Sequence, residues 1–393
     1  MVSAPLSDAR NHASAPRPRI ALIAGTRPEC LKLASTHAAL LRRAEPLLIG
    51  SGQHPAMVAR TCAHLGLTLD LTLPAPPPPA TLSRSVRHLR DGLRDALVRL
   101  APAAVVVQGD TSTAYAGALA ARLAGVPLAH LEAGLRTADP RRPFPEEPFR
   151  RRIAPLARWH FAPTLGAAAH LRAEGIADGA IHVVGNPIVD LLRETVQGEP
   201  LEPCPVGWRD RFERLLTLTL HRRENYGRGL DAVCAAMRAL LERHPDLGLV
   251  CPVHPNPLVG TRMRRLLADH PRAILTEPLD YRPFVRLLAA STLVVTDSGG
   301  IQEEVPYLGV PTLVVREATE RPECLDTGVV RLVAPQPEAI VAAVDLALTQ
   351  PRPRPMPFDA DAPFGDGHAG ERVAAVLLAA LPAPHASLTR CSA

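Results

Sequence analysis

Short runs of Val, Ile and Leu alternate with longer amphipathic or alanine-rich stretches along most of the chain. Such runs are typical of buried strands, and their alternation with helical stretches is typical of parallel sheets joined by crossover helices. The pattern therefore predicts an α/β fold. The predicted strands are 20–24, 46–49, 104–107, 127–131, 182–184, 215–220, 247–250, 274–275, 293–296 and 312–315. The predicted helices are 31–43, 113–124, 230–243, 283–290, 300–308 and 370–381.

The pattern is interrupted by proline-rich segments. Residues 74–80 and 351–358 carry too much proline for a helix or a central strand. The periodicity also stops at 200–206, which we interpret as a linker, and a chain of 393 residues suits two domains of ordinary size. We predict a disordered leader at 1–18, a first domain at 19–200 and a second domain at 201–365. Residues 366–393 should form a last helix, which packs back on the first domain, and a tail.

Composition narrows the classes of function. The net charge of +5 is spread along the chain, and no basic run is interleaved with aromatic residues, so the sequence argues against a nucleic-acid partner. No apolar stretch approaches the ~20 residues of a membrane span. The seven cysteines form no CxxC pair and no regular framework. We expect a cytoplasmic protein, and its modest positive charge is compatible with a small anionic substrate.

Lysine and asparagine are scarce. Lys32 is the single lysine, and the asparagines are Asn11, Asn186, Asn225 and Asn256. Abundant Arg, Ala and Pro indicate a GC-rich genome, which disfavours Lys and Asn codons. A residue that persists against this bias is a candidate for a chemical requirement, with chance survival as the alternative.

The strongest local motif is TDSGGIQEE at 296–304. A strand ends in this motif and a helix begins directly after it. Gly299 and Gly300 let the backbone approach a ligand, and the free N–H groups of the first helical turn suit a diphosphate. Glu304, one turn into the helix, can accept both hydroxyls of a ribose. An ordinary turn capped by Ser298 is the structural alternative.

Charged residues follow apolar strands at several further points. Asp110 ends AVVVQGD, Glu132 follows PLAHL, and His221 follows LLTLTL. Glu146 and Glu147 lie in RPFPEEP, which we interpret as a proline-stiffened loop that cannot be helical. Carboxylates buried at a sheet edge cost free energy unless they are paired or take part in chemistry, so these residues are candidates for acid/base catalysis.

Arginines near these carboxylates allow a structural explanation, and cations after the first strand could instead bind a ligand. The carboxylates could belong to a purely structural ion-pair network with Arg136, Arg150, Arg222 and Arg223. After the first strand, however, GTRPE and Lys32 place positive charge where a ligand can reach it. GTRPE also replaces the GxGxxG of nicotinamide dinucleotide sites, and no metal-ligand spacing occurs. We therefore predict neither a cofactor nor a metal.

Together these motifs resemble the non-hydrolysing UDP-N-acetylglucosamine 2-epimerases, from about residue 20 to about residue 380. Nine pieces occur in the family's order: GTRPE-x-x-K, GQH, GDTST, H-x-EAGLRT, PFPEE, HRREN-x-G, VHPNP, DSGGIQEE and ERPE. The resemblance implies a GT-B-like fold, in which two Rossmann-like domains with parallel sheets face an interdomain cleft and the second domain holds most of UDP. It also implies a homodimer.

The resemblance implies roles for individual residues. The implied catalytic set is Asp110, Glu132, Glu146 and His221. The implied substrate-binding set is Arg27, Lys32, Arg150, His254, Phe284, Ser298, Gly299, Gly300, Glu304 and Arg321, with Phe284 at the uracil.

The implied reaction converts UDP-N-acetylglucosamine to UDP-N-acetylmannosamine. The C2 hydrogen is not acidic, so UDP must leave from C1 as C2 is deprotonated, giving a 2-acetamidoglucal to which UDP adds again. This reaction needs acid/base groups on both ring faces and stabilisation of the departing diphosphate. The alternatives are a hydrolysing 2-epimerase that releases ManNAc and UDP, a changed N-acyl or hexose group for secondary metabolism, a GT-B glycosyltransferase, and a non-catalytic UDP-sugar sensor.

The chain departs from the family pattern after GQH, where Pro55 and Ala56 replace a usual polar pair. In bacterial members this region forms a second UDP-sugar site that activates the enzyme. We therefore expect that activation to be lost here.

Overall fold

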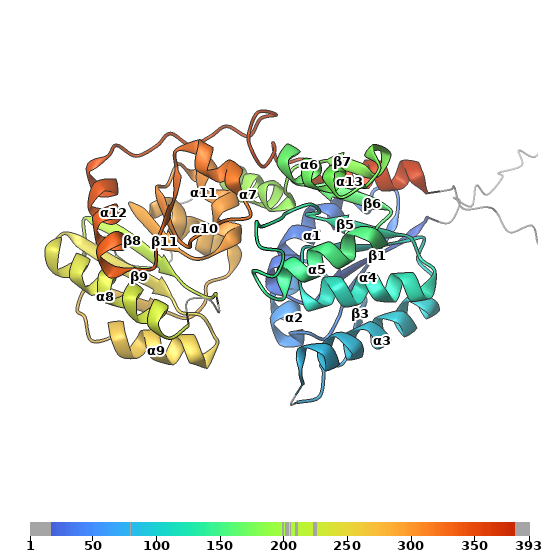
Figure 1. The fold of residues 1–393 in the computed structure, drawn as a ribbon, viewed down its shortest axis with the longest axis horizontal. Coiled ribbons are helices and arrows are strands. Elements are labelled where there is room, and N and C mark those ends of the chain that lie inside the picture. Colours follow the sequence, from blue (N-terminus) through green and yellow to red (C-terminus); the bar gives the residue numbers. More distant parts are fainter. Residues whose placement is uncertain are drawn as a thin grey trace, which may run out of the picture.

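The computed structural model describes residues 17–381, apart from 79, 199, 201–203, 205, 209–210 and 223–225. Almost all of the predicted leader and most of the predicted linker lie outside the described residues, so the domain boundaries stay predictions. Figure 1 shows two lobes side by side, the first coloured blue to green and the second yellow to orange.

The first lobe is built on a seven-stranded sheet in the order β3-β2-β1-β4-β5-β6-β7, and its strand pairs are all parallel. Its strands are β1 (Arg19–Ala24), β2 (Glu45–Gly50), β3 (Leu71–Thr72), β4 (Ala104–Gln108), β5 (Leu128–Leu131), β6 (Trp159–Ala162) and β7 (Ile181–Val183). Its helices are α1 (Arg27–Leu40), α2 (Pro55–His64), α3 (Leu82–Leu100), α4 (Ser112–Ala124), α5 (Glu146–Ile153), α6 (Leu165–Ala173) and α7 (Pro187–Gly198).

The second lobe repeats this plan with a six-stranded parallel sheet in the order β10-β9-β8-β11-β12-β13. Its strands are β8 (Arg214–Thr219), β9 (Leu247–Pro252), β10 (Ala273–Thr276), β11 (Leu293–Thr296), β12 (Thr312–Val315) and β13 (Val330–Val333). Its helices are α8 (Arg228–Arg243), α9 (Pro257–Leu267), α10 (Tyr281–Ala290), α11 (Gly299–Leu308) and α12 (Pro337–Thr349), and a last helix, α13 (Ala369–Ala380), follows. The short 3-10 helix η4 (Pro322–Thr327) lies between β12 and β13.

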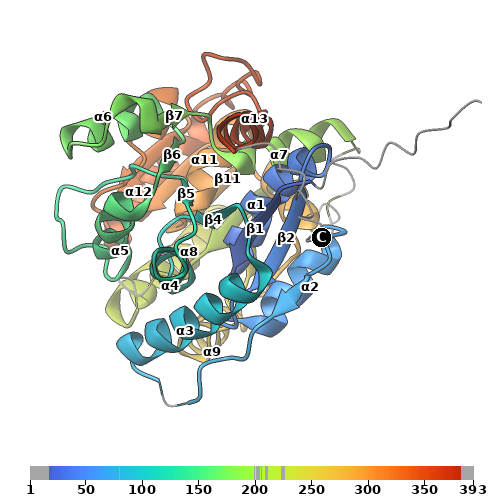
Figure 2. The same ribbon diagram turned by 90° about the vertical axis from the view of Figure 1, so that its right-hand side faces the viewer.

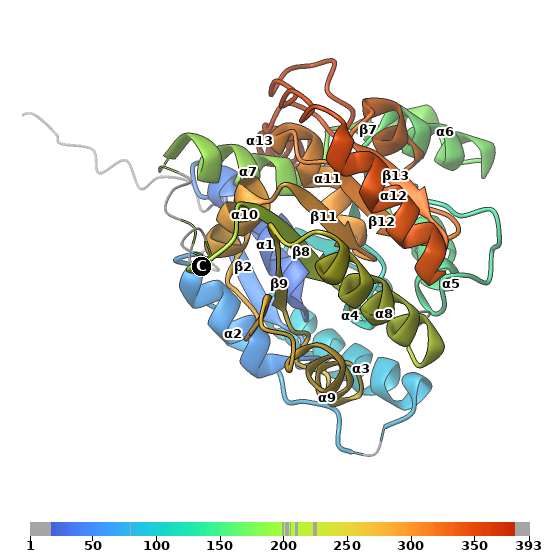
Figure 3. The ribbon, with the colours of Figure 1, turned by 90° about the vertical axis from the view of Figure 1, so that its left-hand side faces the viewer.

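Each sheet is buried on both faces, which explains its continuous apolar runs. In β1, Ile20 and Leu22 pack with α1, α2 and α13, while Ala21 and Ile23 face the opposite way and pack with α3, α4 and α5. The second sheet has α8, α9 and α12 on one face, as Figure 3 shows, and α10 and α11 on the other. Both sheets are thus the middle layers of α/β/α sandwiches, as predicted.

The last helix returns to the first lobe. Val373 and Leu377 of α13 are buried in the same core as Ile20 and Leu33, and Figure 2 shows α13 beside α1 and α7. Asp190 of α7 accepts hydrogen bonds from the N–H groups of the first turn of α13. The lobe of the first sheet therefore contains residues from both ends of the described chain.

Two predictions about local structure were wrong. RPFPEEP is not all loop, because Glu146 begins α5. Pro145 precedes this helix and Pro148 lies in its first turn, where proline costs no intrahelical hydrogen bond. Helix α1 likewise begins at Arg27, with Pro28 in its first turn, rather than at residue 31. Among the described residues, no helix is long and apolar enough to cross a membrane.

Candidate active site

The topology places the candidate residues at two facing sheet edges. In each sheet the strand order reverses at its first strand, between β1 and β4 and between β8 and β11. Open α/β sheets bind ligands outside the carboxyl ends of the strands at such a reversal. The predicted residues follow β1, β4 and β5 in the first sheet, and β8, β9, β10, β11 and β12 in the second.

Glu132 follows β5 and has an unusual backbone conformation. Its φ of 63° lies in the left-handed region, which costs a residue other than glycine ~1 kcal/mol or more. The side chain is 8% exposed, and its oxygens accept hydrogen bonds from the amides of Gln108 and Asn186. Such strain persists only where the surroundings hold it, and it is common at functional sites.

Two cations from different lobes bind the Glu132 carboxylate. Lys32 Nζ lies 2.5 Å from Glu132 Oε1 and 3.2 Å from Glu303 Oε2. Arg321 places Nη2 3.1 Å from Glu132 Oε1 and Nε 2.5 Å from Glu303 Oε1. Burial alone would raise the pKa of Glu132, but the charges of Lys32 and Arg321 outweigh it and lower that pKa to about 2. Glu132 is therefore an ionised carboxylate, and this group of four joins the facing edges.

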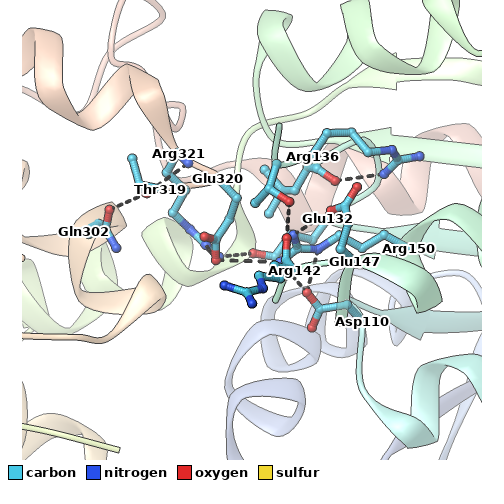
Figure 4. A network of polar contacts seen from close by, with 12 residues as sticks. Asp110, Glu132, Arg136, Arg142, Glu147, Arg150, Gln302, Thr319, Glu320 and Arg321 are labelled. Atoms are coloured by element: carbon cyan, nitrogen blue, oxygen red, sulfur yellow. Dashed lines mark hydrogen bonds and ion pairs between the residues drawn. The ribbon is translucent and has the colours of Figure 1, made fainter. Parts of the chain in front are cut away.

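Arg150 organises a second pair of carboxylates. Its Nη2 lies 2.6 Å from Asp110 Oδ2, and its Nη1 lies 3.1 Å from Glu147 Oε2. Glu146 lies close enough to interact with the charge of Asp110, and burial, followed by that charge, raises the pKa of Glu146. Asp110 is thus ion-paired with Arg150, and Glu146 retains a proton more readily than an exposed glutamate does. Figure 4 shows Arg150 between Asp110 and Glu147.

The amino terminus of α11 has the geometry of an anion site. Ser298 precedes the helix and its side chain makes no capping hydrogen bond, so the simple capping explanation does not hold. A Cβ on Gly299 would lie 2.7 Å from Arg321 Nη1 and 3.1 Å from Arg222 Nη2, whereas one on Gly300 would meet nothing within 4 Å. Free helical N–H groups and two guanidinium groups therefore converge at Gly299, which suits a diphosphate.

His221 is oriented by a buried aspartate. Its Nδ1 lies 3.0 Å from Asp297 Oδ1, and Asp297 also accepts hydrogen bonds from the backbone N–H groups of His221 and Arg222. This contact assigns the proton to Nδ1 in the neutral ring, which leaves Nε2 as the acceptor. The ring of His254 stacks 6.1 Å from that of His221.

Glu304 lies on α11, next to Glu303 in the sequence. It is 4% exposed, and burial, reinforced by the charge of Glu303, raises its pKa to about 7. Arg27, from the opposite lobe, is close enough to interact with the charge of Glu304. Phe284 of α10 is half-buried against the apolar cluster that contains Tyr281.

The structure brings most of the predicted residues into one connected site and adds partners outside the predicted catalytic and substrate-binding sets. The partners are Gln108, Asn186, Asp297, Glu303 and Glu320. The sequence pointed to Asn186 because it persists in an asparagine-poor chain. The other four lie inside the sequence motifs or beside predicted residues. Within the part of the chain that the structure describes, no group of three or more His, Cys, Asp or Glu residues could hold a metal ion.

Comparisons with known proteins cover nearly the whole chain. A family model described as UDP-N-acetylglucosamine 2-epimerase matches residues 38–378. A UDP-N-acetylglucosamine 2-epimerase of Yersinia pestis is 36% identical over 364 residues, which span 90% of this chain and 97% of that protein.

Solved structures agree. The UDP-GlcNAc 2-epimerase of Neisseria meningitidis bound to UDP-GlcNAc matches with a TM-score of 0.85 at 31% identity, over 92% of this chain and 100% of that one. The Methanocaldococcus jannaschii UDP-GlcNAc 2-epimerase in complex with UDP-GlcNAc and UDP matches with a TM-score of 0.81 at 30% identity, over 92% and 99%. The similarity thus extends over both sheets.

Proposed function

The chain belongs to the UDP-N-acetylglucosamine 2-epimerase family, and on this basis we propose that it inverts C2 of UDP-N-acetylglucosamine without hydrolysing the nucleotide sugar. It is an isomerase of that family. The observation that carries the proposal is the buried cluster in which Glu132, Lys32, Glu303 and Arg321 join the carboxyl ends of the two sheets. A carboxylate next to cations and a helix terminus is the set of groups that an elimination of diphosphate requires.

The reaction proceeds by elimination and re-addition. The C2 proton passes to a base as the C1–O bond breaks. The electron pair of the C2–H bond forms the C1–C2 double bond of a 2-acetamidoglucal. The bond pair of C1–O leaves with UDP. A proton then adds to C2 from the opposite face, and the β-phosphate oxygen attacks C1. No electrons enter or leave overall, so the step needs no oxidant or reductant.

We assign binding to the groups around α11 and to the cations opposite. The backbone N–H groups at Gly299 and Gly300 and the hydroxyl of Ser298 receive the diphosphate with Arg321 and Lys32, because all of these are donors that favour anionic oxygens. The remaining assignments follow the family pattern: ribose to Glu304, uracil to Phe284, and phosphate or sugar to Arg27, Arg150, His221 and His254.

We assign proton transfer to Asp110, Glu132, Glu146 and His221. The ion-paired Glu132 is ionised and can accept a proton once the diphosphate competes for Lys32 and Arg321. Glu146, whose pKa is raised by burial, is better suited to donate one. The protonated Nδ1 of His221, bound to Asp297, leaves Nε2 available to the substrate.

We further propose a cytoplasmic location and a homodimer. The location agrees with a reaction on a nucleotide sugar and with cysteines that are scattered along the sequence without a regular spacing. Light scattering on the purified protein should give twice the mass of one chain, and a monomer would contradict the dimer.

One experiment tests the proposed reaction. Purified protein is incubated with UDP-N-acetylglucosamine in D2O and followed by NMR. We expect deuterium at C2 and the appearance of UDP-N-acetylmannosamine. Free N-acetylmannosamine with UDP would show the hydrolysing reaction instead. Protein that exchanges no C2 hydrogen would exclude both reactions.

A further inference from the structure

Glu320 lies at the centre of the arginines of the site. It follows β12, is 2% exposed, and has four guanidinium groups around its carboxylate. The closest nitrogens on each arginine are Arg321 Nη1 at 2.6 Å, Arg316 Nη1 at 2.8 Å, Arg222 Nη2 at 3.1 Å and Arg150 Nη2 at 3.6 Å. Figure 4 shows Glu320 and Arg321 reaching toward Arg150 and Glu132 from the opposite edge.

Three of these arginines have a second contact that belongs to the site. Arg321 and Arg222 reach the position that a Cβ on Gly299 would occupy, at the amino terminus of α11. Arg150 binds Asp110. One carboxylate therefore connects the end of the site that suits a diphosphate with the end that carries the acid/base groups.

The arrangement has a physical cost that Glu320 offsets. Four guanidinium groups within reach of one point repel one another, and each arginine side chain loses rotamer entropy when it is fixed. A buried carboxylate among them removes most of the repulsion and holds each planar fork in one orientation. Donors fixed in this way need no reorganisation when negative charge develops on the leaving diphosphate.

We propose that Glu320 is a positioning residue for the elimination step. It holds the guanidinium groups of Arg222 and Arg321 toward the departing diphosphate and that of Arg150 against Asp110. It does not itself touch the substrate. This inference rests on the proposed function, since it names a residue that acts through the groups assigned to that reaction.

Kinetics of Glu320→Gln separate positioning from simple charge neutralisation. The amide keeps the size of the side chain but cannot hold four cations. If Glu320 positions the arginines, kcat falls by about 10²-fold, as expected for misplaced donors, while KM does not rise. If it only compensates charge, its loss adds positive potential beside the diphosphate, and KM falls with kcat retained.

Two further variants complete the test. Glu320→Asp keeps the charge but has a shorter reach, so it should show an intermediate kcat; it also serves if Glu320→Gln does not fold. Glu317→Gln changes an exposed carboxylate in the same segment and should leave kcat and KM unchanged. The affinity for UDP and the thermal melting of each variant report folding separately from turnover.

The outcomes distinguish this inference from the proposed reaction. Wild-type protein that exchanges C2 hydrogen, with a kcat for Glu320→Gln within about threefold of wild type, would overturn the positioning role alone. A raised KM at constant kcat would also overturn it. Absence of C2 exchange in the wild type would instead contradict the proposed function.

Discussion

Glu132 combines two properties that oppose each other in a base. Its ion pairs keep it ionised and fixed, but the same pairs make it a weak proton acceptor, because its pKa is lowered to about 2. A diphosphate bound to Lys32 and Arg321 would share their positive charge and so raise the basicity of Glu132. Proton abstraction would then depend on an occupied site, which suits a reaction whose intermediate must not escape.

Replacing Glu132 tests whether its carboxylate is the base that removes the C2 proton. Glu132→Gln keeps the shape of the side chain and a carbonyl acceptor for Lys32, but it cannot take a proton. We expect the rate of C2 deuterium exchange to fall by about 10²–10⁴-fold, with the affinity for UDP changed by only a few fold. NMR in D2O and calorimetry measure the two quantities. Glu174→Gln, which alters an ion pair with Arg136, is the control and should retain the exchange rate.

The raised pKa of Glu304 predicts a pH-dependent affinity. Only the ionised carboxylate can accept hydrogen bonds from both ribose hydroxyls. Below pH 7 the free protein carries a proton on Glu304 that must leave on binding. The affinity for UDP-N-acetylglucosamine should therefore fall by about tenfold for each pH unit below 7.

Calorimetry in the Glu132→Gln background, in which turnover is slowed by about 10²–10⁴-fold, isolates this effect. The diphosphate diester of the ligand has no group that titrates near neutral pH. Adding Glu304→Gln should weaken binding at pH 8 and remove most of the slope between about pH 5.5 and 7. An equal slope with and without Glu304 would show that another group titrates.

At the scale of residues, the sequence was most informative where chemistry restricts composition. Lys32, the single lysine, lies between Glu132 and Glu303, and Asn186 donates to Glu132. Glu303 and Glu320 could not be assigned in this way, because some of their partners are far away in the sequence: Lys32 for Glu303, and Arg150 and Arg222 for Glu320. Only the three-dimensional arrangement shows that they share those partners.

Strands were easier to predict than helices. Strands buried on both faces have continuous apolar runs, so β11 and β12 were predicted with their observed bounds. Helices with a proline in the first turn were misplaced or missed, as in α1 and α5, since proline is acceptable in a first turn although it breaks a helix interior. Helix α3 was not predicted, although it is 19 residues long.

The contact between α13 and α1 predicts a specific weakness. A Cβ on Gly370 would lie 2.5 Å from the backbone carbon of Ser35, and backbone cannot move aside as a side chain can. Gly370→Ala should therefore reduce the free energy of unfolding by about 1–3 kcal/mol. Gly179→Ala, at an exposed glycine with nothing within 4 Å, is the matched control for urea denaturation. Equal stability of the two variants would contradict the tight packing.

At the scale of the molecule, buried groups that titrate in opposite directions shape the pH dependence of stability. Burial raises the pKa of Glu29 from 4.5 to about 7, so the folded state binds more protons than the unfolded state between these values, and stability falls as pH rises. Burial lowers the pKa of His130 and of His160 from 6.5 to about 4, so these residues make stability rise with pH over a similar range. The effects offset one another in the wild type.

Replacing Glu29 makes the opposing pH dependences of stability measurable, because only the contribution of the histidines then remains. Glu29→Gln loses the acid's contribution, so its stability relative to wild type should increase between pH 5 and 7, by up to about 3 kcal/mol. Glu29→Gln also removes a carboxylate acceptor for Gly25, Thr26 and Thr111. This loss lowers the free energy of unfolding by the same amount at every pH. Urea denaturation across this pH range measures the difference, and parallel profiles for the two proteins would contradict it.

The return of α13 to the first lobe has a consequence for synthesis on the ribosome. Chains are made from the amino terminus at roughly 5–20 residues per second, and amino-terminal domains usually fold first. Here the core around Ile20 and Leu33 stays uncovered on one side until Val373 and Leu377 emerge, after the whole second lobe has been made. The nascent first lobe therefore waits roughly 10–30 seconds with an apolar face open to chaperones.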